Sequence, residues 1–405
     1  MSQAARARTA HSRRLSEGAS FHLQASIISS FLAGSSAPTA LYAVYQSSMG
    51  FSATMLTVIF GVYSIGVLAA LLVFGRLSDH IGRRPVLLAA TLAQAAAMLL
   101  FIEADSTWHL LAARLVQGLI TGAAVSAAGA AMLDINKQAG GVANSVAPPI
   151  GTALGGLLSG LFVQFLPAPT ALIYVCLAAI YLFQFACLLQ TAETVTSRAG
   201  AIRSLVPRLA LPSMVRRAVL RTIPTLVATW AVAGFYASLG PKLMRGFGGN
   251  HAALLGGFAL AVFSAIAAAS VLATQKAQPL KMLKTSSVAL LVGLLVSAIG
   301  IKQTSLATFM IGTALLGVGY GTGFQGSIRS VAALLAPEAR AGALSVLFIV
   351  SYFSMGVPAI LAGYRLTATG NVQRTAEELG IAALVLAIAA LLAELRGHGQ
   401  RSSGE

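Results

Sequence analysis

Long apolar runs recur along this chain of 405 residues, separated by short polar segments. Each run comes close to the roughly 20 residues that an α-helix needs to cross a bilayer. Charged residues make up only 9% of the chain, against about 25% in soluble proteins, and the mean hydropathy is +0.82. We therefore predict an all-α integral membrane protein with twelve transmembrane helices, over residues 21–45, 54–74, 86–102, 110–133, 142–165, 172–189, 222–239, 252–274, 287–301, 307–330, 344–363 and 379–395.

A long polar stretch, residues 191–221, divides this apolar pattern into halves with six spans each. It is rich in arginine and contains prolines, as expected of a cytoplasmic linker. Two halves of this kind are the arrangement of a parallel duplication. We therefore expect a basic cytoplasmic tail (1–20), an amino-terminal six-helix bundle (21–190), the linker (191–221), a carboxy-terminal six-helix bundle (222–396) and a short tail (397–405).

The positions of the cations explain the net charge of +16. Basic residues concentrate in the tails, the linker and alternate loops, whereas the remaining loops hold only Lys242, Arg245, Lys302, Arg365 and Arg374. By the positive-inside rule, both termini are cytoplasmic. Anionic headgroups account for such a charge, so we expect membrane lipids and not nucleic acid as its partner. We expect a monomer in a bacterial cytoplasmic (inner) membrane.

A polar turn between the second and third spans runs from Gly75 to Pro85 and reads Gly-Arg-Leu-Ser-Asp-His-Ile-Gly-Arg-Arg-Pro. Asp79 falls at the C-terminal end of a helix, where the macrodipole disfavours an acid, so it needs a cation. Arg83, four residues on, is one candidate. Asp134 ends the fourth span in the same way, which predicts a charge cluster of Asp79, Arg83 and Asp134 at the cytoplasmic face.

This turn resembles the signature loop between the second and third helices of the major facilitator superfamily, through Gly75, Leu77, Ser78, Asp79, Gly82, Arg83 and Arg84. The resemblance implies two six-helix bundles that rock about a central site near the bilayer midplane. It also implies that the acid and arginine of the turn help to hold the outward-facing state. We therefore assign a conformational switch to Gly75, Asp79, Gly82, Arg83, Arg84 and Asp134.

Two further segments resemble motifs of exporters in this superfamily. Arg114 to Gly118 is similar to the fourth-helix R-x-x-Q-G motif. Pro148 and Pro149 resemble the fifth-helix glycine-proline motif of proton-coupled antiporters, although Ala147 stands where that motif has glycine. Glycines at four-residue spacing predict tight helix contacts. The residues expected to serve helix packing are Gly118, Pro148, Pro149, Gly151, Gly155 and Gly156.

Polar residues inside the spans are candidates for a substrate or coupling cavity. Arg114 lies a turn inside its span, where a charge costs roughly 2.5–3.5 kcal/mol. It either faces a cavity with Gln117 and Thr121 or snorkels to the outer headgroups. The serines of the first span either line a cavity or pack against a neighbouring helix. The candidate set is Arg114, Gln117, Thr121, Ser26, Ser30, Thr225, Thr229, Trp230, Tyr236, Gln325, Ser351 and Tyr352.

Signals for other chemistry are weak. The six histidines are scattered with no pair at metal-ligand spacing, and no Walker loop is present. Gly321 to Gly326 formally matches a dinucleotide fingerprint, but it lies inside an apolar span and lacks the βαβ context. No constellation of serine, cysteine and histidine supports catalysis. We expect no enzyme activity, no metal and no cofactor.

Proton-coupled transporters usually rely on an acid within the membrane, and no carboxylate occupies the middle of a span here. The eleven acids fall near the two faces or in the tails, with Glu394 near the inner face. The resemblance nevertheless favours a secondary transporter that exports a small lipophilic compound or drug in exchange for protons. Two alternatives stay open: an uncoupled exporter or facilitator of sugars or other metabolites, and a membrane sensor that binds a ligand without transporting it.

Overall fold

The computed structural model describes residues 14–207, 213–248, 252–335 and 337–402, and the regular elements in these ranges are all helices. Twelve spans of the described chain are long and apolar enough to cross a membrane. This confirms the predicted all-α, twelve-span architecture.

The first six spans are α2 (Glu17–Ser36) continued by α3 (Pro38–Met49), α4 (Ala53–Phe74), α6 (Arg83–Ile102), α7 (Thr107–Ile135), α8 (Lys137–Phe165) and α9 (Pro169–Leu188). The last six are α11 (Ser213–Ser238), α13 (Ala252–Ala273), α14 (Pro279–Lys302), α15 (Leu306–Ala332), α16 (Pro337–Thr369) and α17 (Val372–Ser402). Three short helices, α5 (Ser78–Ile81), α10 (Ala201–Ser204) and α12 (Gly240–Gly248), lie between them.

Several boundaries differ from the expected ones. The first span is interrupted at Ala37, because Pro38 has no N–H to continue the helical ladder. α11 begins at Ser213, inside the segment expected to be linker, and α17 continues to Ser402, inside the expected tail. Hydropathy misses such extensions because the added turns are polar.

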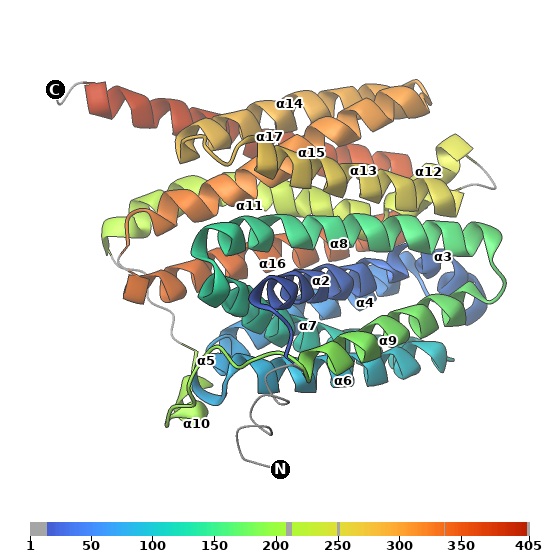
Figure 1. Ribbon diagram of the computed structural model, residues 1–405. Coiled ribbons are helices and arrows are strands. Elements are labelled where there is room, and N and C mark those ends of the chain that lie inside the picture. Colours follow the sequence, from blue (N-terminus) through green and yellow to red (C-terminus); the bar gives the residue numbers. More distant parts are fainter. Residues whose placement is uncertain (1–13, 208–212, 249–251, 336, 403–405) are drawn as a thin grey trace, which may run out of the picture.

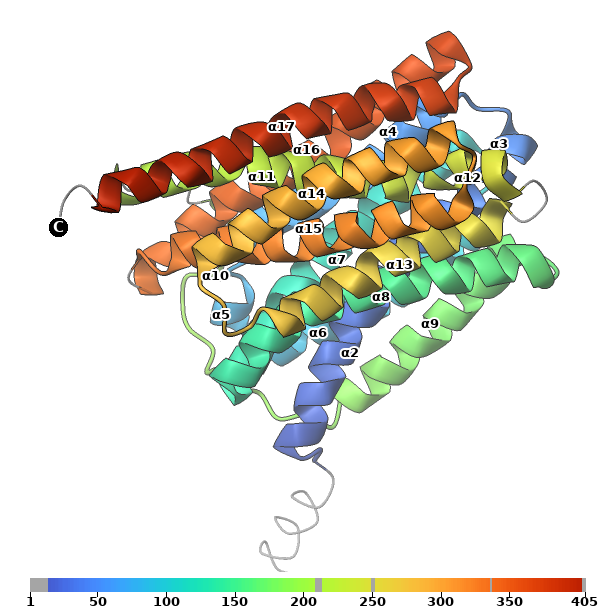
Figure 2. The ribbon, with the colours of Figure 1, turned by 90° about the horizontal axis from the view of Figure 1, so that it is seen from above.

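The helices form two bundles. α2 to α9 occupy one half of the molecule and α11 to α17 the other (Figures 1 and 2). α8 packs along α13 and α4 packs along α16, so these four helices form the interface. At one end, Thr54 bonds to Thr367 Oγ1 through its N–H at 3.0 Å and its hydroxyl at 2.9 Å. Elsewhere along the interface, Ser145 Oγ donates to Gln325 Oε1 at 2.9 Å.

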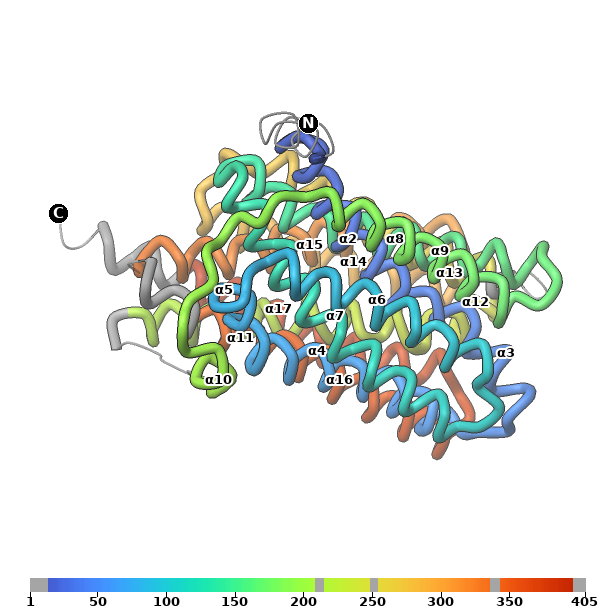
Figure 3. The backbone as a smooth tube through the Cα atoms, turned by 60° about the horizontal axis from the view of Figure 1, so that its bottom comes forward, coloured from blue at the N-terminus to red at the C-terminus, as the bar shows by residue number. Residues whose placement is uncertain are grey.

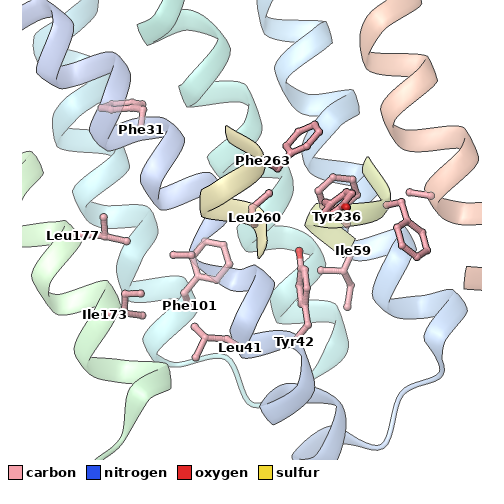
Figure 4. Packing of buried hydrophobic residues seen from close by; sticks show 14 of the residues in the cluster. Phe31, Leu41, Tyr42, Ile59, Phe101, Ile173, Leu177, Tyr236, Leu260 and Phe263 are labelled. Atoms are coloured by element: carbon pink, nitrogen blue, oxygen red, sulfur yellow. The ribbon is translucent and has the colours of Figure 1, made fainter. Parts of the chain in front are cut away.

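The buried apolar core continues from one bundle into the other. Tyr42 and Ile59 of the first bundle belong to the same cluster as Tyr236, Leu260 and Phe263 of the second (Figure 4). The rings of Tyr236 and Phe263 stack with centroids 5.1 Å apart. The two bundles therefore meet in a packed apolar contact at this level.

Helix backbones approach one another most closely at the expected packing glycines. A Cβ atom on Gly151 would lie 2.1 Å from the carbonyl oxygen of Ser29. A Cβ atom on Gly155 would lie 2.1 Å from the carbonyl oxygen of Ala33. α8 thus contacts α2 backbone to backbone, which only residues without a side chain allow.

The other expected packing residues have different neighbours. A Cβ atom on Gly118 would lie 2.4 Å from a backbone oxygen of α4. Gly156 faces the second bundle, where its Cβ position is 3.0 Å from Leu260 of α13. Pro148 and Pro149 lie inside α8, which continues through them.

Replacing Gly155 by leucine is expected to destabilise the protein, because the side chain has no room between α8 and α2. Overpacking typically costs about 1–3 kcal/mol. Thermal unfolding of the detergent-solubilised protein measures the loss. Gly141→Leu is the matched control, since its Cβ position on the same helix has no atom within 4 Å. Equal unfolding midpoints for the two variants would contradict the packing role of Gly155.

Candidate functional site

The turn between α4 and α6, which we call the hinge (residues 75–85), folds around Arg83. The buried Arg83 side chain donates through Nε to Asp134 Oδ2 at 3.1 Å and through Nη1 to Ser78 Oγ at 2.7 Å. Nη1 also bonds to the Asp79 carboxylate. The structure thus brings together the three charges that the sequence predicted to cluster. Two carboxylates and a hydroxyl satisfy a guanidinium that burial would otherwise leave unpaired.

A carboxylate from the linker, Glu193, completes the hinge. Its Oε1 accepts from the backbone N–H of Arg83 at 2.9 Å, and its Oε2 accepts from the N–H of Arg84 at 3.0 Å. These N–H groups open α6, so they have no acceptor within the helix and lie at the positive end of its dipole. Glu193 therefore caps α6. Sequence analysis missed this residue, because a cap supplied 110 positions later leaves no local pattern.

Gly82 and Arg84 support the same contact. Gly82 has a φ of 102°, a conformation that favours glycine, and its Cβ position is 2.5 Å from Glu193 Oε2. Arg84 donates to the carbonyl oxygens of Leu188 and Leu189 at 3.0 and 2.5 Å. Those carbonyls end α9, where a cation is stabilising. The hinge is thereby joined both to the start of α6 and to the end of α9.

The linker then crosses the hinge as a strap, residues 191–204 (Figure 3). Arg198 N–H and Ser197 Oγ both donate to the carbonyl oxygen of His80, at 2.8 and 3.0 Å. α10 follows directly. The strap therefore belongs structurally to the amino-terminal bundle.

Arg114 lies inside the amino-terminal bundle and is 1% exposed. Its Nη1 donates to the carbonyl oxygen of Ser35 at 3.0 Å and to Gln117 Oε1 at 2.6 Å. Its guanidinium carbon lies 4.3 Å from the centroid of the Tyr63 ring. Gln117 donates in turn to the carbonyl oxygen of Gly34 at 3.0 Å. This enclosure favours the interior-facing alternative over snorkelling.

Three polar atoms in this region are buried without a well-formed hydrogen bond to a described residue. They are Arg114 Nε, Tyr42 Oη and Thr121 Oγ1. Because buried polar groups are almost always bonded, such a set is suited to a polar ligand or to ordered water. We call Arg114, Gln117, Thr121, Tyr42 and Tyr63 the arginine site.

An aromatic cluster occupies the carboxy-terminal bundle, with Trp230 of α11 at its centre. The Trp230 ring lies 5.7 Å from Tyr320 and 5.2 Å from Phe324, both on α15, and 5.2 Å from Tyr352 on α16. Its Nε1 is buried without a described partner. Tyr352 lies on α16, which packs along α4, the helix that carries Tyr63. The aromatic cluster therefore approaches the arginine site across the bundle interface.

Other residues predicted to line the cavity make different contacts. Ser30 Oγ donates to Gln184 Oε1 at 3.0 Å, and Gln184 Nε2 donates to Ser26 Oγ at 3.2 Å. Since Gln184 lies on α9, these bonds favour the packing role for both serines. Gln325 bonds to Ser145 across the interface, as described above. Ser351, next to Tyr352, is buried and its hydroxyl has no well-formed bond to a described residue.

Thr225, Thr229 and Tyr236 face the interior of the carboxy-terminal bundle. The methyl groups of Thr225 and Thr229 lie 3.0 Å from the Cβ position of Gly323 on α15. Tyr236 Oη and Thr313 Oγ1 share a hydrogen bond of 2.7 Å. These three residues of α11 therefore contact neighbouring helices. Tyr236 also reaches the aromatic cluster through Phe263, whose ring lies 5.3 Å from that of Tyr320.

A cavity of about 220 Å³ lies among α11, α14, α15 and α17. Its polar lining comes from Tyr236, Ser297, Lys302 and Glu377, and its other walls are apolar. Of the residues predicted to line a central cavity, Tyr236 is the one found here. This cavity is thus inside one bundle and separate from the arginine site.

One acid is more deeply buried than the sequence indicated. Glu394, which the sequence placed near the inner face, is buried between α17, α11 and α14. Its Oε1 accepts from Ser287 Oγ at 3.1 Å and from Thr225 Oγ1 at 3.4 Å. Hydropathy locates a residue along the membrane normal but not on a face of its helix, so this burial was not predicted. Elsewhere in the described ranges, no three acidic, histidine or cysteine side chains gather as metal ligands would.

Comparison with known proteins supports this architecture. Residues 25–298 match the family model described as Major Facilitator Superfamily. The solved nucleoside transporter NupG has a TM-score of 0.67 at 11% identity, covering 92% of this chain and 98% of that one. An inward-facing, unoccupied bacterial homologue of the human lysosomal transporter Spinster has a TM-score of 0.72 at 13% identity, covering 93% and 97%. At these identities the likeness shows the fold alone.

A curated relative matches over a shorter stretch. The multidrug resistance protein MdtL of Klebsiella pneumoniae (strain 342) is 34% identical over 86 residues. The match covers 21% of this chain and 22% of that protein.

Removing the Glu193 carboxylate is expected to loosen the strap. Glu193→Ala leaves two N–H groups of α6 without an acceptor, and losing a helix cap costs about 0.5–2 kcal/mol. Trypsin should then cleave the detergent-solubilised protein faster at Arg198 and Arg203, by up to roughly tenfold for each 1.4 kcal/mol lost. Glu103→Ala, which removes an exposed acid between α6 and α7, is the control. Equal cleavage rates would show that Glu193 does not hold the strap.

Proposed function

Because this chain belongs to the Major Facilitator Superfamily of membrane transporters, we propose that it is a secondary transporter that exports a small lipophilic or weakly anionic compound in exchange for protons. It works by alternating access, in which the two bundles rock about a site between them. We place it in a bacterial cytoplasmic membrane, as a monomer, with both termini inside.

A row of residues on neighbouring helices across the bundle interface carries this proposal. The Arg114 guanidinium stands 4.3 Å over the ring of Tyr63 on α4, and α4 packs along α16, which carries Tyr352. The ring of Tyr352 lies 5.2 Å from that of Trp230. A charge, two hydroxyls and an indole thus come from both bundles, where transporters of this architecture bind substrate. These four residues are the proposed centre of the substrate site.

The chemistry of the arginine site and of the aromatic cluster suggests the class of substrate. Both acceptors of Arg114, a carbonyl and an amide oxygen, are neutral, so its positive charge is not cancelled by them. Its Nε–H makes no well-formed hydrogen bond to a described residue and can therefore serve as a donor to a ligand. The aromatic cluster offers an apolar surface to a ring or chain. A neutral or weakly anionic lipophilic compound suits this pair better than a strongly cationic drug.

Export is supported by the resemblance of Arg114 to Gly118 to the exporters' fourth-helix motif. The partial similarity to MdtL, which is named as a multidrug resistance protein, points in the same direction. The open alternative is an uncoupled transporter of sugars or other metabolites. Measuring proton movement and solute movement separately distinguishes the two.

We propose that the hinge is the conformational switch. Arg83 joins α5, α6 and α7 through bonds to Asp79 and Asp134, so these helices move as one unit while the cluster is intact. The aspartate of the hinge is half exposed and can change partners when the bundles rock.

Proteoliposomes that contain a pH-sensitive dye test the function directly. A panel of lipophilic weak acids, neutral lipophilic drugs and sugars is added one compound at a time. We expect proton movement with some of the lipophilic compounds, and a loss of roughly tenfold or more in Arg114→Ala, because bonds to a charged group contribute about 1.5–3 kcal/mol. Arg245→Ala, an exposed arginine on α12, is the control.

Two outcomes would contradict this function. Labelled solute that equilibrates without proton movement would favour the uncoupled transporter. Binding of a compound without its counterflow would favour a sensor.

Replacing Asp79 by asparagine is expected to slow transport roughly tenfold or more, because Arg83 loses one of its charged partners. The yield of folded protein in the membrane should be unchanged, since Asp134 and Ser78 still bind Arg83. Transport rates in proteoliposomes measure the effect, with the exposed loop variant Asp105→Asn as the control. Equal transport by the wild type and Asp79→Asn would remove the hinge acid from the mechanism.

A further inference from the structure

The burial of Glu394 is not explained by the proposed substrate site. The residue lies one position before the end of the apolar part of α17, and its side chain is 5% exposed. One carboxylate oxygen, Oε1, receives hydrogen bonds from Ser287 and Thr225. The other, Oε2, is buried and has no partner among the described residues.

Few charges of the described side chains surround this carboxylate. Lys284 of α14 is half-buried and near enough to act on Glu394 electrostatically, but no described cation forms an ion pair with it. Arg221 of α11 and Lys281 of α14 are exposed to the surroundings. On α16, the cation within the described side chains is Arg365, which pairs with Glu378. The described parts of α11, α14 and α16 therefore leave Glu394 without a paired counter-charge.

Such a site favours the protonated acid. An ionised carboxylate that is buried without a paired cation loses its hydration and gains little in return, whereas a neutral carboxyl group avoids most of that loss. Two hydroxyl donors to one oxygen are compatible with either form, since the carbonyl oxygen of a neutral acid also accepts. The group is therefore able to hold a proton while buried and to release it when water reaches it.

We propose that Glu394 is the proton-binding site of this transporter and couples proton movement to the rocking of the carboxy-terminal bundle. The inference rests on the proposed function as an exchanger, and it supplies a buried acid near the end of a span where the sequence offered none in the middle of one. Across the exchange cycle, Oε2 takes up the proton from one side of the membrane and releases it to the other, and no other bond is made or broken.

Two helices connect this site to the aromatic cluster. Thr225, which bonds to Glu394, lies on α11 a little over one turn before Trp230. Pro224, directly before it, lacks an N–H and weakens the helix at that point. On α15, Gly323 contacts Thr225, and the next residue is Phe324 of the aromatic cluster.

A change of charge at Glu394 therefore acts on α11 next to its weak point. Loss of the proton converts the two hydroxyl contacts into charge-assisted hydrogen bonds, which are shorter and stronger. The Thr225 bond, long at 3.4 Å, has room to shorten. Its shortening draws α11 toward α17 and shifts Trp230 relative to the interface.

Infrared difference spectroscopy of the purified protein tests proton binding without any substrate. We expect a protonated-carboxyl band at neutral pH that Glu394→Gln lacks and that Glu103→Gln, an exposed-loop control, retains. Ser287→Ala should move this band to higher frequency, because the carboxyl oxygen loses a hydrogen-bond donor. The same band in Glu394→Gln as in the wild type would overturn the proposal.

Tryptophan fluorescence tests the proposed coupling between Glu394 and α11. The chain has two tryptophans, and Trp108 is 74% exposed, so Trp108→Phe leaves the buried Trp230 as the single fluorophore. Trp230 emission should change with pH in this background and stay constant when Glu394→Gln is added. Identical pH profiles with and without the glutamate would refute the coupling.

Transport measurements distinguish a failure of this inference from a failure of the proposed function. In proteoliposomes, Glu394→Gln should retain counterflow of a transported compound but lose proton-driven movement. Unchanged proton movement in Glu394→Gln would overturn the inference while leaving the transporter intact. A wild type that transports nothing would overturn the proposed function, and the infrared band would then decide proton binding alone.

Discussion

Close contact between helix backbones is the constraint on which the other features depend. In hydrocarbon, apolar side chains gain little by turning inward, so helices associate through tight packing and polar bonds. Gly151 and Gly155 let α8 reach the carbonyls of α2, and Gly257 of α13 approaches the carbonyl of Gly156 across the interface, where its Cβ position is 2.3 Å away. The same proximity lets a carbonyl of α2 accept a bond from Arg114. In this protein, the close packing of the helices therefore also determines which polar bonds can form between them.

The chemistry of the two bundles differs although their helices correspond. The first bundle buries a cation, Arg114, among tyrosines and amide oxygens. The second buries an acid, Glu394, among hydroxyls, and gathers the aromatic rings around Trp230. In the proposed exchange, Arg114 of the first bundle would bind an acceptor group of the substrate, whereas the aromatic rings and Glu394 both belong to the second bundle. The proton and the apolar part of the substrate would therefore act on the same bundle.

Most of the fold and part of the candidate site could be predicted from the sequence. The spans follow from hydropathy, and the Asp79–Arg83 pair follows from a spacing of four residues across a short turn. Glu193 and Glu394 were not recognised as partners of distant helices, because their roles depend on rotation and packing that a linear pattern does not contain. Ser26 and Ser30 show the same limit, since a polar stripe lines a cavity or bonds to a neighbour equally well until Gln184 is placed.

The hydrogen bonds of the strap shorten the free segment of chain that connects the two bundles. Its bonds to His80 attach the chain to the hinge as far as Arg198, and α10 ends at Ser204 beside α5. α11 begins at Ser213, so residues 205–212 are the whole covalent connection left between the bundles. A segment of that length spans at most roughly 26–29 Å when fully extended. In the proposed alternating-access motion, the separation of the bundles on this side therefore has an upper limit set by the chain, and releasing Glu193 would raise that limit.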